Sequence, residues 1–256
     1  MSSKNYSLRK EILNIMMSPY GNPIDVVDFG LSVKWLKYNL AGNKLTDDES
    51  NYGYYYQWGS TVGYPNASKH EFTWETTPFI KSAPEITFTK YVTNSKFGAV
   101  DNNTILDPED DAVTSLLGSE YRMPTNDEYE ELYKHCRGTS NTSGIPNTLL
   151  SGVASISKNG IYWIAAGTTI DGIKYENAGC LFVGQDITKR IFFPAAGNCC
   201  GSYVNDVGST GFYWSSSLYS RYSNSAYYLS FYNGYVFSIN IDTRYDGFAI
   251  RGVKVK

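Results

Sequence analysis

The side chains of this chain that could support catalysis are two histidines, a serine run and two pairs of adjacent acids. A Ser–His–Asp arrangement has only His70 and His135 from which to take its base. Ser215–Ser217 lies in no G-x-S-x-G turn, the motif that exposes a hydrolase nucleophile. The acids Asp110–Asp111 and Glu130–Glu131 are neighbours on predicted helices, so they do not face each other across a cleft. The sequence therefore predicts a protein that is not an enzyme.

Metal and redox chemistry also lack their usual residue patterns. Four cysteines occur, at Cys136, Cys180, Cys199 and Cys200. They form no C-x-x-C pair, and only the adjacent His135 lies near one of them, so we expect reduced thiols and no zinc site. The acids of residues 107–111 lack the alternating oxygen ligands of a calcium loop and complement a helix dipole instead. We therefore expect neither a metal nor a cofactor.

The chemistry that remains is recognition, and it is concentrated in residues 211–256. Eight tyrosines fall between Tyr213 and Tyr245, mixed with serine, asparagine, aspartate and arginine. Tyrosine supplies contact area at low entropic cost, and the small polar residues supply adaptable hydrogen bonds. Apolar alternation predicts strands with one buried face, formed by Leu229, Phe231, Val236, Ile239 and Ile241. The predicted ligand-binding surface consists of Tyr219, Arg221, Tyr222, Asn224, Tyr228, Ser230, Tyr232, Asn233, Tyr235, Asn240, Asp242, Arg244, Tyr245 and Asp246.

Several elements must position this surface. Residues 6–17 have helical apolar spacing, and this helix either packs on its own domain or serves assembly. The pattern of residues 25–40 predicts a strand pair around Gly30, and the pattern of residues 51–60 predicts an aromatic strand. Residues 61–104 are irregular, with Trp74 and Phe79 as expected anchors.

Two further helices are predicted before the chain turns to strands. A short one spans residues 107–118, with Asp107 as its N-cap and Gly118 at its end. The other follows a capping box of Thr125 and Glu128 and places Tyr129, Leu132, Tyr133 and Cys136 on one face. From residue 145 onward, short apolar runs at 161–164, 179–183 and 190–193 predict strands. The pattern predicts an α+β domain over residues 24–256, preceded by an attachment segment at 1–23.

The composition limits the kinds of partner that the protein can bind and the cellular compartment in which it is expected. The formal net charge of −3 and the charged fraction of 18% leave no basic stripe for nucleic acid. No apolar run approaches the ~18 residues of a membrane span. The N-terminal residues contain no apolar signal-peptide core. We therefore expect a protein that is cytoplasmic at synthesis or part of a virion, or a secreted or cell-surface protein whose native signal was removed.

A series of motifs, in order along almost the whole chain, resembles a known family. They are Asp28–Trp35 (DFGLSVKW), Asn51–Gly59 (NYGYYYQWG), Leu106–Ala112 (LDPEDDA), Tyr121–Glu128 (YRMPTNDE), Phe193–Gly197 (FPAAG), Gly211–Ser216 (GFYWSS) and Ala249–Val253 (AIRGV). Together they resemble the Fibrobacter succinogenes major paralogous domain of gut Bacteroidales and their phages, which is related to the formylglycine-generating type of C-type lectin fold. Tyr121 and Gly252 stand where that family usually has Trp and Pro.

The resemblance implies a C-type lectin-like fold with two main helices, several short antiparallel strands and a ligand face in the C-terminal segment. That segment is also similar to the variable proteins of diversity-generating retroelements. We expect a receptor-binding protein of a phage or prophage particle that contacts a protein or glycan on a host or neighbouring cell. The N-terminal helix would attach it to the virion or form a homotrimer.

Two alternatives stay open. One is a secreted structural or adhesin domain of a gut Bacteroidales bacterium. The other is a degenerate formylglycine-type enzyme, although no cysteine follows Cys200 to provide the copper-binding pair of that family.

Overall fold

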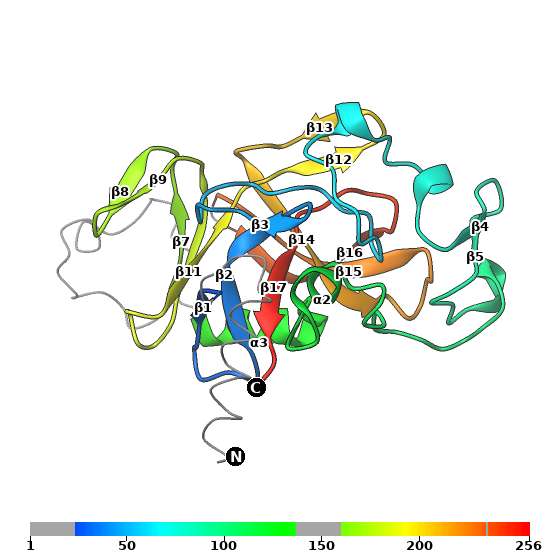
Figure 1. Ribbon diagram of the computed structural model, residues 1–256, viewed down its shortest axis with the longest axis horizontal. Coiled ribbons are helices and arrows are strands. Elements are labelled where there is room, and N and C mark those ends of the chain that lie inside the picture. Colours follow the sequence, from blue (N-terminus) through cyan, green and yellow to red (C-terminus); the bar gives the residue numbers. More distant parts are fainter. Residues whose placement is uncertain (1–23, 137–159, 234) are drawn as a thin grey trace, which may run out of the picture.

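The computed structural model describes residues 24–136, 160–233 and 235–256, and its first sheet joins the beginning and the end of that range (Figure 1). Strand β2 (Lys34–Ala41) pairs antiparallel with the last strand, β17 (Arg251–Lys254). The short strands β1 (Val26–Val27) and β3 (Lys44–Leu45) pair with β2, and β6 (Tyr121–Arg122) pairs with β17. The predicted strand pair around Gly30 is confirmed by β1 and β2.

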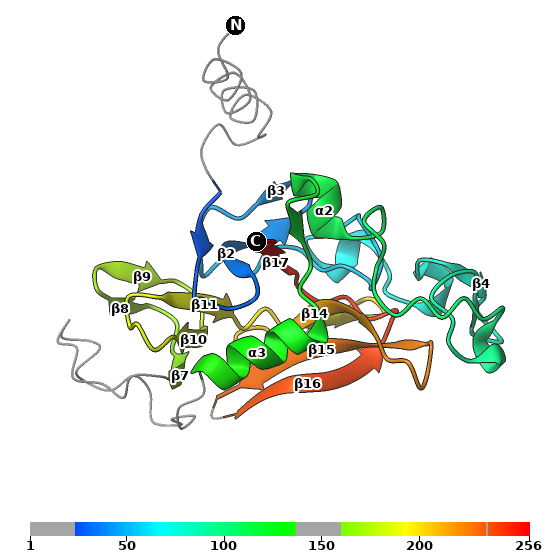
Figure 2. The ribbon, with the colours of Figure 1, turned by 90° about the horizontal axis from the view of Figure 1, so that it is seen from below.

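The second sheet carries most of the predicted ligand surface. It has the order β14 (Thr210–Leu218), β15 (Ser225–Tyr232), β16 (Tyr235–Thr243), and all its pairings are antiparallel. Helix α3 (Asn126–Cys136) lies along one face of this sheet, as Figure 2 shows. Strand β16 has a neighbour on one side only, so it forms an edge of the sheet.

The remaining strands form a third sheet and three hairpins. The third sheet has the order β11 (Arg190–Pro194), β10 (Gly179–Val183), β7 (Gly160–Ile164), which confirms the three strands predicted from apolar runs. The hairpins are β4–β5 (Ile80–Ser82 and Thr87–Phe88), β8–β9 (Thr168–Ile170 and Ile173–Tyr175) and β12–β13 (Asn198–Cys200 and Tyr203–Asn205). The strand predicted at residues 51–60 is wrong, because this segment makes only isolated bridges through Tyr55 and Tyr56.

The two α-helices in the described part of the chain differ in how well their ends were predicted. The capping box of α3 is confirmed: the Glu128 amide donates to Thr125 Oγ1 over 3.3 Å, and the Thr125 amide donates to Glu128 Oε2 over 2.8 Å. Helix α2 spans only Ala112–Leu117, because its N-cap is Asp111, whose Oδ1 accepts the Val113 and Thr114 amides, rather than Asp107. Gly118 ends α2 as predicted.

The prediction of an α+β, C-type lectin-like fold with two main helices is therefore wrong for the described residues, which form mainly antiparallel strands. The physical reason is that α2 has only 6 residues, while short hairpins occupy segments with weak individual patterns. The helix predicted at residues 6–17 lies outside the described residues.

Two large clusters of buried side chains hold the sheets together. One lies between α3 and the second sheet and includes Tyr129, Leu132 and Phe231. The other lies on the opposite face of that sheet and includes Trp58, Trp214 and Phe248. The sheet carrying the predicted ligand surface is thus covered on both faces over much of its length, which restricts the side chains that can reach a ligand.

Buried Arg251 links the first and third sheets. Its guanidinium donates to Asn39 Oδ1 over 2.7 Å and to the Phe192 carbonyl over 2.9 Å. It also lies 4.8 Å from the centre of the Phe193 ring. Arg251 therefore serves the fold.

The long segment 61–104 wraps one end of the molecule with elements of its own. It contains three short 3-10 helices, η1 (Ala67–Lys69), η2 (Trp74–Thr76) and η3 (Ser95–Phe97), around the β4–β5 hairpin. Trp74 packs edge-on against Phe88 and Tyr245, and Phe79 packs against Tyr91. Trp74 therefore connects this segment to Tyr245, and Phe79 packs against the buried cluster that contains Trp58 and Trp214.

Candidate ligand-binding surface

The connection between β14 and β15 displays a compact group of aromatic and basic side chains, which we call the tyrosine turn: Tyr219, Arg221 and Tyr222, together with Tyr227 at the start of β15. The Tyr219 ring lies 5.9 Å from the Tyr222 ring and 5.4 Å from the Tyr227 ring, centre to centre. The Arg221 guanidinium lies 5.6 Å from the centre of the Tyr222 ring. Arg221 is exposed and Tyr222 is 44% exposed, so the group presents a cation and aromatic faces to solvent.

The backbone of the tyrosine turn is fixed by hydrogen bonds within the turn. The Tyr222 amide donates to the Tyr219 carbonyl over 3.1 Å, and the Tyr219 amide donates to the Ser225 carbonyl over 3.0 Å. The Ser225 amide in turn donates to the Tyr222 carbonyl over 3.0 Å. A closed turn of this kind holds the side chains on it in a narrow range of positions.

A second set of bonds ties the turn to residues 93–94 of the long wrapping segment. Ser223 is fully buried, and its hydroxyl oxygen accepts the Thr93 amide over 2.9 Å and the Asn94 amide over 3.3 Å. The Thr93 hydroxyl donates to the Ser220 carbonyl over 2.7 Å. The turn is thus anchored to a part of the chain more than a hundred residues away, a link that sequence reasoning did not find.

Arg244 lies beneath the turn, in the interior. It has no exposed surface, and its guanidinium is 4.1 Å from the centre of the Phe88 ring and 4.8 Å from that of Trp58. Its Nη1 donates to the Ser223 carbonyl over 3.0 Å, and burial lowers its pKa to about 9. The prediction that Arg244 contacts a ligand is therefore corrected: its charge faces aromatic rings, and it holds the turn from inside.

The opposite end of β15 carries a second exposed group, which we call the hairpin tip: Tyr232, Asn233 and Tyr235. The two tyrosine rings lie 4.9 Å apart and are 40% and 55% exposed. Strand β15 has 8 residues and separates the tip from the tyrosine turn, so its ends are roughly 26 Å apart at ~3.3 Å per residue. The predicted surface is therefore two separate patches.

Between these patches, several predicted ligand residues are buried. Tyr228 is covered by Trp214 and Phe248, at ring-centre distances of 6.0 and 4.9 Å. Tyr228, Ser230 and Asp246 are each 5% exposed. Their assignment to the surface is corrected, because the sheet is covered on the face away from α3 by residues from distant parts of the chain. Asn224, Asn240, Asp242 and Tyr245 are half-buried.

The predicted core positions have mixed outcomes. Leu229 and Phe231 are fully buried, as predicted, and Val236 is partly buried against the same cluster. Ile241 is 39% exposed, so its assignment to the core is wrong. It lies on the edge strand β16, which has no further strand beside it, and is paired with half-buried Tyr227 of β15. The side chain of Ile239 lies outside the described residues.

Asp242 and Asp246 form a pair of interacting carboxyl groups near the end of β16. They are hydrogen-bonded to each other, and the Thr243 hydroxyl donates to Asp246 Oδ2 over 2.5 Å. Burial, together with the negative charge of Asp242, raises the pKa of Asp246 to about 7. Cys200, which the sequence did not connect with this region, contacts the Tyr245 hydroxyl at 3.9 Å. Near neutral pH the pair can therefore share one proton.

The acidic residues of segment 107–111, which were considered as a possible calcium-binding loop, do lie close together in the structure. Oxygen atoms of Asp107, Glu109 and Asp110 lie within 4.8 Å of one another. The Lys90 ammonium lies among them, 2.6 Å from Asp107 and 2.5 Å from Asp110. A side-chain cation thus already occupies the position that an ion would take.

The cysteines are all free thiols. Burial raises the pKa of Cys136 and of Cys199 to about 12, which makes them unreactive near neutral pH. Cys136 is fully buried, on the face of α3 where the helical spacing placed it with Tyr129 and Leu132. Of the helices among the described residues, none has the length and apolar character needed to cross a membrane.

Comparisons with known proteins found no matching family model, no similar curated protein and no similar solved structure. The resemblance to the Bacteroidales domain family therefore stays a prediction from sequence motifs.

Proposed function

We propose that this chain is a non-enzymatic binding module and that the tyrosine turn is the main contact with its ligand, a protein or glycan on a cell surface. The observation that carries the proposal is the exposed cluster of tyrosine and arginine on a turn that is anchored from beneath. Tyrosine and arginine are enriched at binding hot spots, and anchoring lowers the entropy lost on binding.

The charge of the turn supports a recognition role. Arg221 forms no ion pair with any residue that the structure describes, so its charge is available to a partner. The neighbouring tyrosine hydroxyls can donate or accept hydrogen bonds, and their rings offer stacking faces. This combination suits a ligand surface that presents both apolar area and acceptor groups.

The test is binding of the fluorescently labelled chain to an array of cell-surface glycans and to intact gut bacterial cells. The variant carries Tyr219→Ser, Arg221→Ser and Tyr222→Ser together. We expect it to lose at least about tenfold in affinity for the probe that the unmodified chain binds, because truncated hot-spot residues typically cost ~2 kcal/mol or more each.

The matched control is Tyr203→Ser, since Tyr203 is 74% exposed on strand β13, away from the turn. It should bind as the unmodified chain does. Unchanged binding of the triple variant, or equal losses in both variants, would show that the turn is not the contact.

A further inference from the structure

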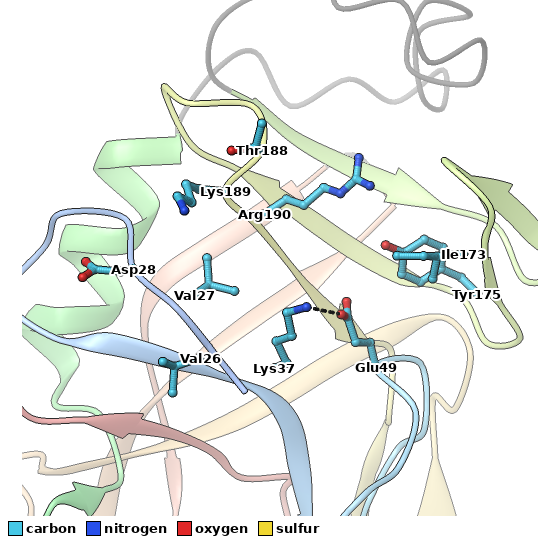
Figure 3. Close-up of a pocket in the computed structure, with 10 residues that line it drawn as sticks. All are labelled: Val26, Val27, Asp28, Lys37, Glu49, Ile173, Tyr175, Thr188, Lys189 and Arg190. Carbon is cyan, nitrogen blue, oxygen red and sulfur yellow. Dashed lines mark ion pairs between the residues drawn. The ribbon is translucent and has the colours of Figure 1, made fainter. Parts of the chain in front are cut away.

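A pocket of about 310 Å³ lies away from the tyrosine turn, between the edge of the first sheet and the β8–β9 hairpin (Figure 3). Strand β1 and Lys37 of β2 form one side. Tyr175 and the residues 188–190 that lead into β11 form the other side, with Glu49 from a loop beside them. The volume is within the range of small-molecule sites.

The walls of the pocket are tied to each other. The Ser50 hydroxyl, next to Glu49, accepts the Glu176 amide over 3.0 Å, and the Ser50 carbonyl accepts the Asn177 side chain over 3.0 Å. These bonds connect the loop carrying Glu49 to the residue that follows Tyr175. The pocket is therefore formed before any ligand arrives, which lowers the cost of binding.

The basic side chains of the pocket differ in how they are paired. The Lys37 ammonium lies 3.6 Å from the Glu49 carboxylate, and Arg190 lies 2.5 Å from Asp171. Lys189 forms no ion pair with a described residue, and the nearby Asp186 carboxylate already accepts the amide and hydroxyl of Thr188. Asp28, also in the lining, is paired with Lys34 at 3.1 Å. Of the basic side chains in the lining, Lys189 is thus the one that forms no ion pair with a described residue, although its positive charge helps to lower the pKa of Asp186.

The turn that carries Lys189 is held in place by its backbone. The Lys189 amide donates to the Asp186 carbonyl over 2.9 Å, and the Gly184 amide donates to the Lys189 carbonyl over 2.9 Å. Figure 3 shows Lys189 on the side of the pocket opposite Lys37, with Val27 between them. An anion seated on Lys189 would therefore rest against an aliphatic wall and face polar groups beyond it.

From this arrangement we infer that the pocket binds a small hydroxylated monocarboxylate. One unpaired cation matches one negative charge, whereas a dianion such as phosphate would leave a charge without compensation. The carboxylate of Glu49 can accept hydrogen bonds from ligand hydroxyls, and the Tyr175 hydroxyl can donate to the ligand. The Thr188 hydroxyl donates its proton to Asp186, so its oxygen can only accept a hydrogen bond from the ligand. Val26, Val27 and Ile173 provide the apolar contact.

The experiment titrates the ¹⁵N-labelled full chain with D-glucuronate and, separately, with D-glucose, and follows the backbone amide signals. Millimolar glucuronate should shift the signals of Glu49, Tyr175 and Thr188, and glucose, which has similar hydroxyls but no charge, should not. Lys189→Gln should weaken glucuronate binding about tenfold, the effect of losing a charge-assisted hydrogen bond.

The matched control is Lys174→Gln, a lysine of the β8–β9 hairpin that is paired with Glu176 and lies outside the lining. It should leave the glucuronate affinity unchanged. Pocket signals that do not move with millimolar glucuronate, that move equally with glucose, or that respond equally in the Lys189→Gln chain would each overturn the inference. Lys189 is exposed, so its substitution should not prevent folding, and a thermal melt checks this.

Discussion

The tyrosine turn and the hairpin tip expose the same types of side chain, but different contacts hold them in place. Both end strand β15 and both expose tyrosines. The turn is bonded to residues 93–94 through Ser223 and rests on the buried Arg244. The tip connects β15 to the edge strand β16, and its two tyrosines pair with each other across the strands. Composition cannot distinguish the two patches, because the difference lies in what is packed beneath them.

The difference shows that two patches with the same types of side chain can be prepared for binding to different extents. Side chains on an anchored turn lose little freedom when a partner binds, which lowers the entropic cost of binding. This is why we assign ligand contact to the turn. The difference in support can be tested by replacing the residues that hold the turn, Arg244 and Ser223, one at a time.

Removing Arg244 should have the largest effect. Arg244→Ala empties a fully buried site surrounded by aromatic rings and leaves the Ser223 carbonyl without its side-chain donor. We expect a loss of about 3–5 kcal/mol in the free energy of unfolding, as for other large-to-small changes in a core. Urea denaturation of the purified chain measures it.

Arg221→Ala is the matched control, because it removes the same side chain from the exposed face of the turn. Its free energy of unfolding should stay within about 0.5 kcal/mol of the unmodified chain. If both arginine variants were equally stable, Arg244 would not be the support that the contacts indicate.

The buried carboxyl pair should make the turn end of the sheet sensitive to pH. The folded-state pKa of Asp246, raised to about 7, is above its unfolded value, so the folded chain holds a proton that the unfolded chain has lost in this range. Stability is therefore full below about pH 4 and falls as the pH rises to 7. We expect a loss of roughly 2 kcal/mol, about half that of an isolated carboxyl with this shift, because Asp242 shares the proton.

Asp246→Asn should flatten this dependence, as measured by urea denaturation at several pH values between 4 and 8. Asp206→Asn, at an exposed position, should leave the pH profile unchanged. A profile that keeps its slope in Asp246→Asn would assign the pH dependence to other groups.

Local sequence patterns correctly predicted those helices and strands whose stabilising residues lie close together in the chain. The capping box of α3 needs only Thr125 and Glu128, and its buried face follows from spacing alone. The strands β7, β10 and β11 were found because both of their faces are largely apolar. The cap of α2 was misplaced because Asp107 and Asp111 are equally good caps by type, and the contact of Asp111 Oδ2 with the Met123 amide, at 2.8 Å, is not visible in the sequence.

The candidate site could be predicted only in part, because exposure depends on distant residues. In the sequence, Tyr228 cannot be distinguished from Tyr219, Tyr222 and Tyr232. In the structure, however, Tyr228 is covered by Phe248, which lies in a loop that returns over the sheet. Arg244 likewise resembles Arg221 in composition and differs only by the aromatic rings that surround it. Alternation indicated the strands, but it could not show that both faces of the sheet are covered.

Removing the Ser223 hydroxyl should have the smallest effect of the three changes and the most local one. Ser223→Ala leaves the buried amides of Thr93 and Asn94 without their acceptor, which should cost about 1–2 kcal/mol. Hydrogen exchange should become faster at these two amides and around the tyrosine turn while the hairpin tip is unchanged. Ser209→Ala is the control, since its hydroxyl makes a single exposed bond to the Asp206 carbonyl at 2.9 Å. Faster exchange at the tip as well would mean that the two patches share one support, and the distinction between them would fail.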